Sequence, residues 1–298
     1  MKNHSAIAHS YALFLEELGL IDTKILVSVD DVMNDPDKVQ LIREHLAKRR
    51  VGSSILDAHR WLSNLLGNYP SIEFPENDFE GEKTNYRITE ETYICHPSLL
   101  AFLEKQGIPI TVAQVFFKQA RIYDAEIRKP FYSLVHRNDE EGVIVSTKSG
   151  QDVIGVNDIT FISGSIPQHG GIHIFRDAFD YLSALMQVNN GRQFNNDAII
   201  LNFYSNLNKA APYIKRYEYG HLYNIPNDEK YYVSDADTFG YKDVYSWMPN
   251  DKRGKLATKS LGDFLKSEPC LKHIPMNPNY AQYQHISAFH RAKYGLIG

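Results

Sequence analysis

The sequence contains little cysteine, no long apolar run and no excess of positive charge. Its two cysteines, Cys95 and Cys270, are too few to complete a zinc ribbon or to build a disulfide scaffold. Because the sequence has neither an apolar run long enough for a membrane span nor a charged and apolar leader, we expect a cytoplasmic protein without a membrane partner. The formal net charge is -4, so any nucleic-acid contact has to come from a local basic patch.

The composition, with 43% hydrophobic and 23% charged residues, is that of a globular protein. Residues 1–66 are expected to form an N-terminal helical segment, in which the pair Asp35-Pro36 predicts a helix start. An apolar stripe follows this pair at Val39, Ile42 and Leu46. Residues 67–91 are rich in Pro, Gly, Asn and acids without a sustained period, which predicts a linker.

The rest of the chain is predicted to contain both helices and strands. Residues 92–168 begin with two short helices, over 95–123 and joined at Gly107, and continue with three strands separated by turns, which predicts a small α+β module with an antiparallel sheet. From about residue 169 to 298, short apolar strands alternate with helices, beginning with Ile172 to Phe175. This alternation predicts an α/β fold with a mainly parallel sheet flanked by helices.

The junction after the first of these strands carries two charged residues, Arg176 and Asp177. In open α/β sheets, ligands bind beyond the carboxyl ends of the strands, where the next helix presents its positive N-terminus. An acid at this place suggests metal or proton chemistry, whereas a cation suggests a phosphate or a salt bridge. The junction is therefore the first candidate for a functional site.

Three stretches resemble Toprim-domain proteins related to bacterial DNA primases, especially the primase-like proteins of mobile elements. They are "HPSLLAFLEKQGIPITVAQ" at 96–114, "IFRDAFDYLSAL" at 174–185 and "LNFYSNLNKAAPYIKRY" at 201–217. The likeness covers residues 91 to about 260, hardly extends to residues 1–66, and lacks the cysteines of the family's zinc ribbon. It implies a primase-like module followed by a Toprim-like domain, and a role in DNA replication or processing. The implied partner is DNA, single-stranded by preference, or a replication or mobile-element protein.

The resemblance also implies where metal chemistry would lie. The family places a glutamate after the first strand and an Asp-x-Asp pair after a later one, and these acids hold Mg²⁺ or Mn²⁺ for nucleotidyl transfer or strand cleavage. In "FRDAFD" at 175–180, Arg176 stands where the glutamate is expected, and Asp180 matches a further acid of the motif. We therefore expect a degenerate site without a metal cofactor.

The place of the Asp-x-Asp pair is open, because three stretches compete for it. In the preferred interpretation, residues 229–251 are an insertion, one acid is lost, and either Asp228 or Asp251 keeps the other. In the alternative, Asp235 and Asp237 are the genuine pair. The complete set of metal-ligand candidates is Asp180, Asp228, Asp235, Asp237 and Asp251.

Arg176 is unfavourable for metal binding, because a guanidinium has no lone pair for Mg²⁺ and its charge repels a cation. It can instead pair with Asp180 or bind a nucleic-acid phosphate through two donors. Asp177 is interpreted as a favourable charge at a helix N-terminus rather than as a displaced ligand.

The C-terminal region is the one clearly basic part of the sequence, since residues 252–298 carry a balance of +6 with tyrosines and a phenylalanine interleaved. Such a surface can follow phosphates and stack bases. The nucleic-acid-binding candidates are Arg176, Lys252, Arg253, Lys255, Lys259, Arg291 and Lys293. The favoured function is thus nucleic-acid binding without catalysis. The alternatives are an active Mg²⁺-dependent primase or nuclease that uses Asp180, Asp235 and Asp237, and a protein-interaction module without a nucleic-acid role.

Overall fold

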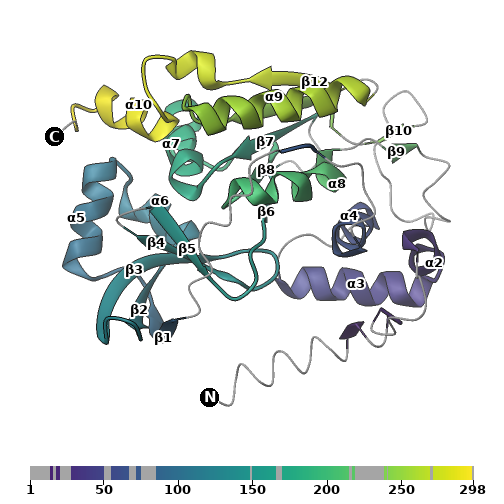
Figure 1. Cartoon of the computed structure of the whole chain (residues 1–298), viewed down its shortest axis with the longest axis horizontal. Coiled ribbons are helices and arrows are strands. Elements are labelled where there is room, and N and C mark those ends of the chain that lie inside the picture. The colour runs from purple at the N-terminus through teal and green to yellow at the C-terminus, as the bar shows by residue number, and fades with distance from the viewer. Residues whose placement is uncertain are drawn as a thin grey trace. The chain divides into compact units, whose positions relative to one another are not determined.

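The computed structural model describes residues 14–15, 18–20, 28–49, 55–66, 72–74, 85–147, 150–165, 170–214, 217–218, 238–239, 241–268 and 271–296. The chain divides into two compact units (Figure 1). The first unit consists of Met1–Pro70 and Tyr217–Phe239, and the second consists of Ser71–Arg216 and Gly240–Gly298. Within the ranges given above, no helix has the length and apolar character needed to cross a bilayer.

The first unit contains a group of short helices and a two-stranded antiparallel ribbon. Its elements are α2 (Val29–Met33), α3 (Pro36–Arg49), α4 (Ile55–Leu66), β9 (Tyr217–Glu218) and β10 (Thr238–Phe239). The predicted helix start is confirmed, because Asp35 Oδ1 accepts hydrogen bonds from the backbone N of Asp37 and of Lys38. The predicted stripe is buried with residues of α2 and α4 in one cluster, which includes Val32, Val39, Ile42, Leu46, Ala58, Trp61 and Leu62.

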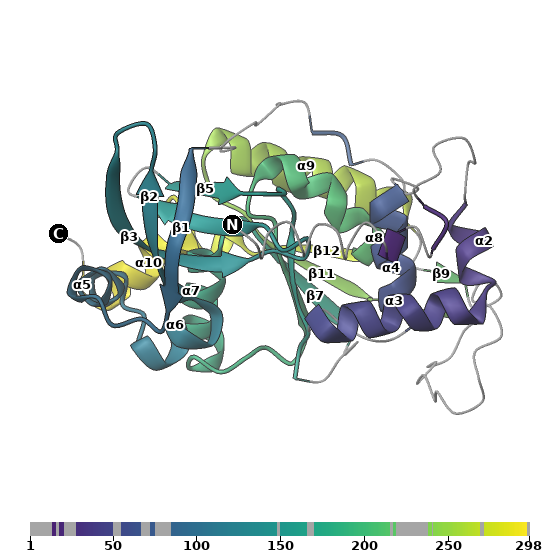
Figure 2. The same ribbon diagram turned by 90° about the horizontal axis from the view of Figure 1, so that it is seen from below.

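The second unit begins with an antiparallel sheet whose strands follow one another in sequence order. They are β1 (Tyr86–Thr92), β2 (Lys118–Asp124), β3 (Lys129–Arg137), β4 (Val143–Thr147) and β5 (Gly150–Ile154). Between β1 and β2 the chain forms α5 (Pro97–Gln106) and α6 (Ile110–Phe116), which lie beside this sheet (Figures 1 and 2). The prediction of a small antiparallel sheet is confirmed.

Two details of this region differ from the prediction. The sheet starts at Tyr86, inside the segment predicted as a linker, and the second predicted helix ends at Phe116. The residues that follow, "KQARIYD", form β2, because Ala120 and Ile122 alternate onto one buried face, a period of two that fits a strand. The prediction extended the helical pattern of the preceding residues into this strand.

The second sheet of this unit is mainly parallel, as predicted. Its strands are β6 (Thr160–Ile162), β7 (Gly171–Phe175), β8 (Asp197–Ile200), β11 (Asp243–Trp247) and β12 (Lys272–Pro275). In the order β12-β11-β7-β8-β6, the first four strands are parallel and β6 is an antiparallel edge strand. The associated helices are α7 (Ala178–Asn189), the 3₁₀ turn η1 (Tyr204–Ala210), α8 (Ala211–Ile214), α9 (Lys252–Ser267), the 3₁₀ turn η3 (Asn277–Tyr280) and α10 (Ile286–Lys293). Figure 1 shows α9 alongside β12.

The prediction of an insertion over 229–251 is wrong for its last part. Residues 243–247 are not part of an inserted loop, because they form β11 and pair in parallel with both β7 and β12. The pattern "DVYSW" gave no continuous apolar run, although Val244, Ser246 and Trp247 are buried. The turn "PND" at 249–251 therefore directly follows a strand of the parallel sheet.

The two sheets of the second unit share one hydrophobic core. Leu103, Phe117 and Leu134 from the antiparallel part belong to the same buried cluster as Phe175 and Trp247 from the parallel sheet. The module predicted for 92–168 therefore lies in the same compact unit as the module predicted for 169–298, except for residues 217–239, which belong to the first unit.

Candidate functional site

Three neighbouring strands of the parallel sheet end side by side, and polar residues follow each of them. Arg176 and Asp177 follow β7, Asn202 follows β8, and Asp251 lies in the turn after β11. Because parallel neighbours end on the same side of a sheet, these residues gather at one place, which we call the carboxyl edge. The predicted position of the functional site therefore coincides with a real convergence of polar groups.

Two of the carboxylates at the carboxyl edge cap helices. Asp177 Oδ1 accepts a hydrogen bond of 2.9 Å from the backbone N of Asp180 at the start of α7. Asp251 Oδ1 accepts one of 2.7 Å from the backbone N of Gly254 at the start of α9. Each carboxylate thus satisfies a helix N–H that has no partner within its helix, and the helix-cap interpretation of Asp177 is confirmed.

Arg176 reaches across to the end of the neighbouring strand β8. Its Nη1 donates a hydrogen bond to the carbonyl oxygen of Asn202. Its guanidinium carbon lies 4.8 Å from the ring centroid of Tyr204 and 5.9 Å from that of Phe203, within the range of cation–π contacts. The side chain is therefore held by groups from η1 and from the residues between β8 and η1, rather than extended freely into solvent.

Asn202, which holds Arg176, is itself fixed by a buried network. It is fully buried and has a φ of 63°, in the left-handed region that disfavours most side chains. Its Oδ1 pairs with Nε2 of His136 at 3.0 Å, and its Nδ2 donates to the carbonyl oxygen of Asp158 at 2.8 Å. Burial lowers the pKa of His136 to about 4, so this ring is neutral and Nε2 is the donor to Asn202. The network ties the antiparallel sheet to the carboxyl edge.

Asp180, the acid that matches the Toprim pattern, is 1% exposed on the first turn of α7. Its Oδ1 accepts a hydrogen bond from the backbone N of Ser287 at 3.3 Å, and its Oδ2 lies 3.8 Å from Nδ1 of His285. Burial by itself would lower the pKa of His285, but Asp180, Asp177 and Asp251 together raise it. The acids of the carboxyl edge therefore favour the protonated form of His285, the residue that precedes α10.

The pKa of Asp177, like that of His285, is raised at the carboxyl edge. Burial, followed by the nearby charge of Asp180, raises the pKa of Asp177 to about 6, although Arg176 and His285 act in the other direction. The carboxyl edge consequently holds its charges in a partly desolvated setting, where each one depends on its neighbours.

The C-terminal segment is fastened to the carboxyl edge by Asn250. Its Nδ2 donates to the carbonyl oxygens of Tyr280, at 3.0 Å, and Tyr283, at 2.8 Å, and its backbone N donates to the carbonyl oxygen of Gln284 at 2.7 Å. Gln284 Nε2 in turn lies 3.4 Å from Oδ2 of Asp251. This anchoring brings His285 next to Asp180.

The described carboxylates of the carboxyl edge have partners within the chain. Across the described ranges, no three His, Cys, Asp or Glu side chains come close enough to hold a metal ion. Asp177 and Asp251 each use an oxygen as a helix cap, and Arg176 places a fixed positive charge beside Asp177. Asp228, Asp235 and Asp237 lie outside the described residues, so the alternative in which they bind metal stays a prediction.

Besides Arg176, the six predicted nucleic-acid-binding residues of the C-terminal region fall into two groups by their position along the chain. Lys252, Arg253 and Lys255 lie in the first turns of α9, next to Asp251 at the carboxyl edge. The second group, Lys259, Arg291 and Lys293, lies further along the chain. Lys259 pairs with Asp263 at 2.7 Å, Arg291 Nη1 donates to Gln106 Oε1 at 2.5 Å, and Lys293 donates to Gln187 Oε1 at 2.8 Å.

Sequence reasoning missed two residues that shape the carboxyl edge, Asn202 and His285. A signal for Asn202 existed, since it directly follows the apolar strand β8 at the edge where ligands bind. No local signal marked His285, because its contact with Asp180 depends on how the C-terminal segment packs. Comparison of the chain with models of known families, with curated proteins and with solved structures finds no match.

Proposed function

We propose that this chain is a Toprim-like protein that binds single-stranded DNA at the carboxyl edge without metal-dependent catalysis. The observation that carries the proposal is Arg176, a fixed positive charge at the place where the resemblance implies a metal-binding glutamate. Its guanidinium offers donors that suit a phosphate and has no lone pair for a cation. The mainly parallel sheet flanked by helices supports the proposal at the level of fold class.

The start of α9 supports the same proposal. Three cations, Lys252, Arg253 and Lys255, follow the capping residue Asp251, and no acidic residue accompanies them in the first turn. The positive end of a helix dipole disfavours each such cation by about 0.3–1 kcal/mol. An anionic partner that lies across this helix end and Arg176 would offset that unfavourable arrangement.

Fluorescence anisotropy with a labelled oligothymidylate tests the proposal over a range of salt concentrations. In a Lys252→Ala/Lys255→Ala variant we expect affinity to fall about tenfold and the log–log salt slope to decrease by about 1.4, the value for two lost single-strand phosphate contacts. The matched control is Lys259→Ala/Lys266→Ala on the same helix, where both lysines are already paired with Asp263. The control should bind nearly as tightly as the unaltered protein.

Two outcomes would overturn parts of this proposal. Absence of salt-dependent DNA binding would remove the nucleic-acid role and favour an interaction with a protein of replication or of a mobile element. Saturable Mg²⁺ or Mn²⁺ binding by calorimetry, lost in an Asp235→Asn/Asp237→Asn variant, would remove the non-catalytic part and restore the primase or nuclease alternative. We expect no saturable heat with either metal.

A further inference from the structure

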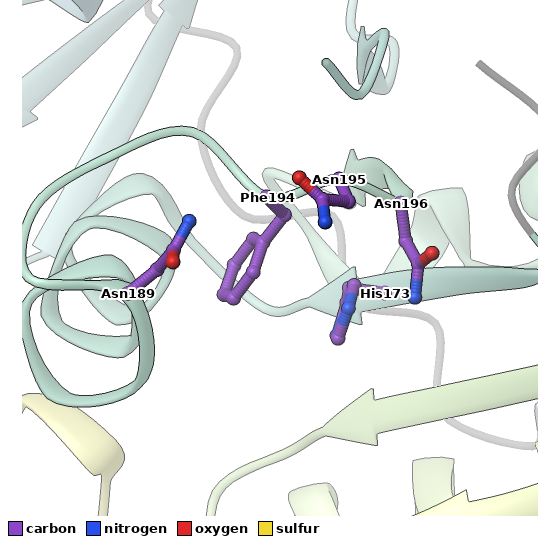
Figure 3. Close-up of a pocket in the computed structure, with 5 residues that line it drawn as sticks. All are labelled: His173, Asn189, Phe194, Asn195 and Asn196. Carbon is purple, nitrogen blue, oxygen red and sulfur yellow. The ribbon is translucent and has the colours of Figure 1, made fainter. Parts of the chain in front are cut away.

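A cavity of about 230 Å³ lies away from the carboxyl edge. It is lined by His173 from β7, Asn189 from the end of α7, and Phe194, Asn195 and Asn196 from the loop before β8 (Figure 3). Because α7 leads the chain back from the end of β7 to the start of β8, its last residue and this loop lie toward the amino ends of the strands. The cavity is therefore separate from the candidate site described above.

His173 presents a hydrogen-bond donor that has no acceptor in the described part of the chain. The side chain is 8% exposed, and its Nδ1 accepts a hydrogen bond of 3.0 Å from Nε1 of Trp247. The indole N–H is a donor only, so Nδ1 of His173 carries the lone pair and Nε2 carries the hydrogen. Burial lowers the pKa of His173 to about 4, which leaves the ring neutral at pH 7.

The neighbours of His173 fix its ring in place. The ring is stacked between Phe194, with centroids 4.4 Å apart, and Tyr245, with centroids 4.7 Å apart. A ring held on both faces and at Nδ1 keeps Nε2 in one position. His173, which carries this donor, is one of the residues that line the cavity.

The amides of the cavity add complementary hydrogen-bonding atoms. Asn195 Oδ1 accepts from Ser165 Oγ at 2.8 Å, so its Nδ2 remains as a donor, and Figure 3 shows this nitrogen directed toward the space between Phe194 and His173. Asn189 Nδ2 donates to the carbonyl oxygens of Arg192 and Gln193, so its Oδ1 remains as an acceptor. The walls thus offer donors, an acceptor and an aromatic ring, and the five lining side chains that the structure describes carry no formal charge at pH 7.

We propose that this cavity binds an uncharged heteroaromatic ring of the size of one nucleobase, with its edge on His173 and Asn195. The volume is below the roughly 300–1,000 Å³ of pockets that take drug-sized ligands, which limits the occupant to one ring system. Amide groups hydrogen-bond the edges of bases, and aromatic side chains contact their faces. The base can belong to a free nucleoside or to single-stranded DNA, and the two sources are separated by the experiment below.

The two tryptophans provide a direct measurement with an internal control. Trp247 Nε1–H is bonded to His173, whereas Trp61 lies in the helical core of the first unit. In ¹H–¹⁵N spectra of the full chain, titration with adenosine, cytidine, thymidine or guanosine should shift the Trp247 indole signal saturably and leave that of Trp61 in place. A Trp61→Phe variant assigns the two signals. A saturable shift with oligonucleotides but with no nucleoside would identify DNA as the source of the base.

Two variants make the proposal falsifiable. Asn195→Ala removes a donor at an exposed position and should weaken nucleoside binding about tenfold, the effect of leaving a ligand group unpaired. Asn279→Ala, at an exposed asparagine of η3, is the matched control and should bind like the unaltered protein. Absence of any saturable Trp247 shift, with nucleosides and oligonucleotides alike, or equal affinity in Asn195→Ala, would overturn the proposal.

The same titration distinguishes this inference from the proposed function. The Lys252→Ala/Lys255→Ala variant alters the start of α9 and leaves the lining of the cavity unchanged. If the cavity binds free nucleosides, this variant should keep the Trp247 shift while it loses affinity for DNA. A nucleoside shift that disappears together with DNA binding in this variant would contradict an independent site in the cavity.

Discussion

The carboxyl edge and the cavity beside His173, whose loop lies toward the amino ends of the parallel strands, shift the pKa of a histidine in opposite directions. At the carboxyl edge, Asp180, Asp177 and Asp251 outweigh burial and raise the pKa of His285. Beside the cavity, burial lowers the pKa of His173 to about 4. The comparison shows that the neighbours of a histidine determine in which direction its pKa shifts in this fold.

The two regions therefore affect stability with opposite signs. His285 has a raised folded-state pKa, so the stability it contributes is present in acid and is lost as the pH rises through that pKa. His173 has a lowered folded-state pKa, so the folded state loses stability as the pH falls below the ordinary histidine value. On acidification, the contribution of His285 to stability should rise and that of His173 should fall.

The largest expected effect comes from breaking the support of the carboxyl edge at Asn202. An Asn202→Ala variant leaves His136 Nε2 and the carbonyl oxygen of Asp158 without their buried partner and places alanine at a left-handed φ. We expect the free energy of unfolding to fall by about 3–5 kcal/mol, measured by urea denaturation.

The matched control for this prediction is Asn190→Ala. Asn190 also has a left-handed φ, 51°, but it is an exposed residue at the end of α7. Its replacement should cost about 1–2 kcal/mol, the backbone contribution alone. Equal losses in the two variants would mean that the buried network of Asn202 adds no stability.

The next effect concerns the opposite end of the sheet. Between pH 7.5 and pH 5, the lowered pKa of His173, about 4, should reduce the free energy of unfolding by roughly 2 kcal/mol. A His173→Phe variant keeps an aromatic ring in the stack and should lose this part of the pH dependence, although it is less stable overall because Trp247 Nε1 loses its acceptor. A variant with the full original pH dependence would exclude His173 as its source.

The fold was predictable wherever the sequence pattern was local. The apolar run of β8 and the helical period of α7 predicted the parallel sheet and its flanking helices, and the structure has both. The strand β11 was missed because "DVYSW" mixes polar and apolar residues, and only its pairing with β7 and β12 makes it a strand. Tertiary pairing, rather than propensity, determines this element.

The candidate site was predictable in its place but not in its partners. Arg176 and Asp177 were found because they follow a strand in an α/β pattern. The contact of Asp180 with the backbone of Ser287 joins residues 107 positions apart, and that of Asn202 with His136 joins residues 66 positions apart. Contacts over such separations depend on the packing of whole elements, which periodicity does not encode.

A smaller change in the free energy of unfolding is expected from Asp177 at the carboxyl edge. Burial and Asp180 raise the pKa of Asp177 to about 6, so the folded state loses stability as the pH rises above the ordinary carboxyl value. Asn is an equally good cap, so Asp177→Asn should raise the free energy of unfolding at pH 7 by about 1–2 kcal/mol after allowance for solvent screening. Asp35→Asn, at the cap of α3, should change stability by less than about 0.5 kcal/mol.

The last prediction tests whether Asp180 raises the pKa of His285. Asp180→Asn keeps an oxygen for the backbone N of Ser287 but removes the negative charge beside the ring. Burial lowers the pKa of His285, and the charge of Asp180 raises it. Without that charge the pKa of His285 should therefore decrease, as measured by the NMR pH titration of its ring. Asp263→Asn, which frees Lys259 and Lys266 on α9, should leave the titration unchanged. If Asp180→Asn leaves the titration unchanged as well, the two ends of the sheet differ for a reason other than the acids of the carboxyl edge.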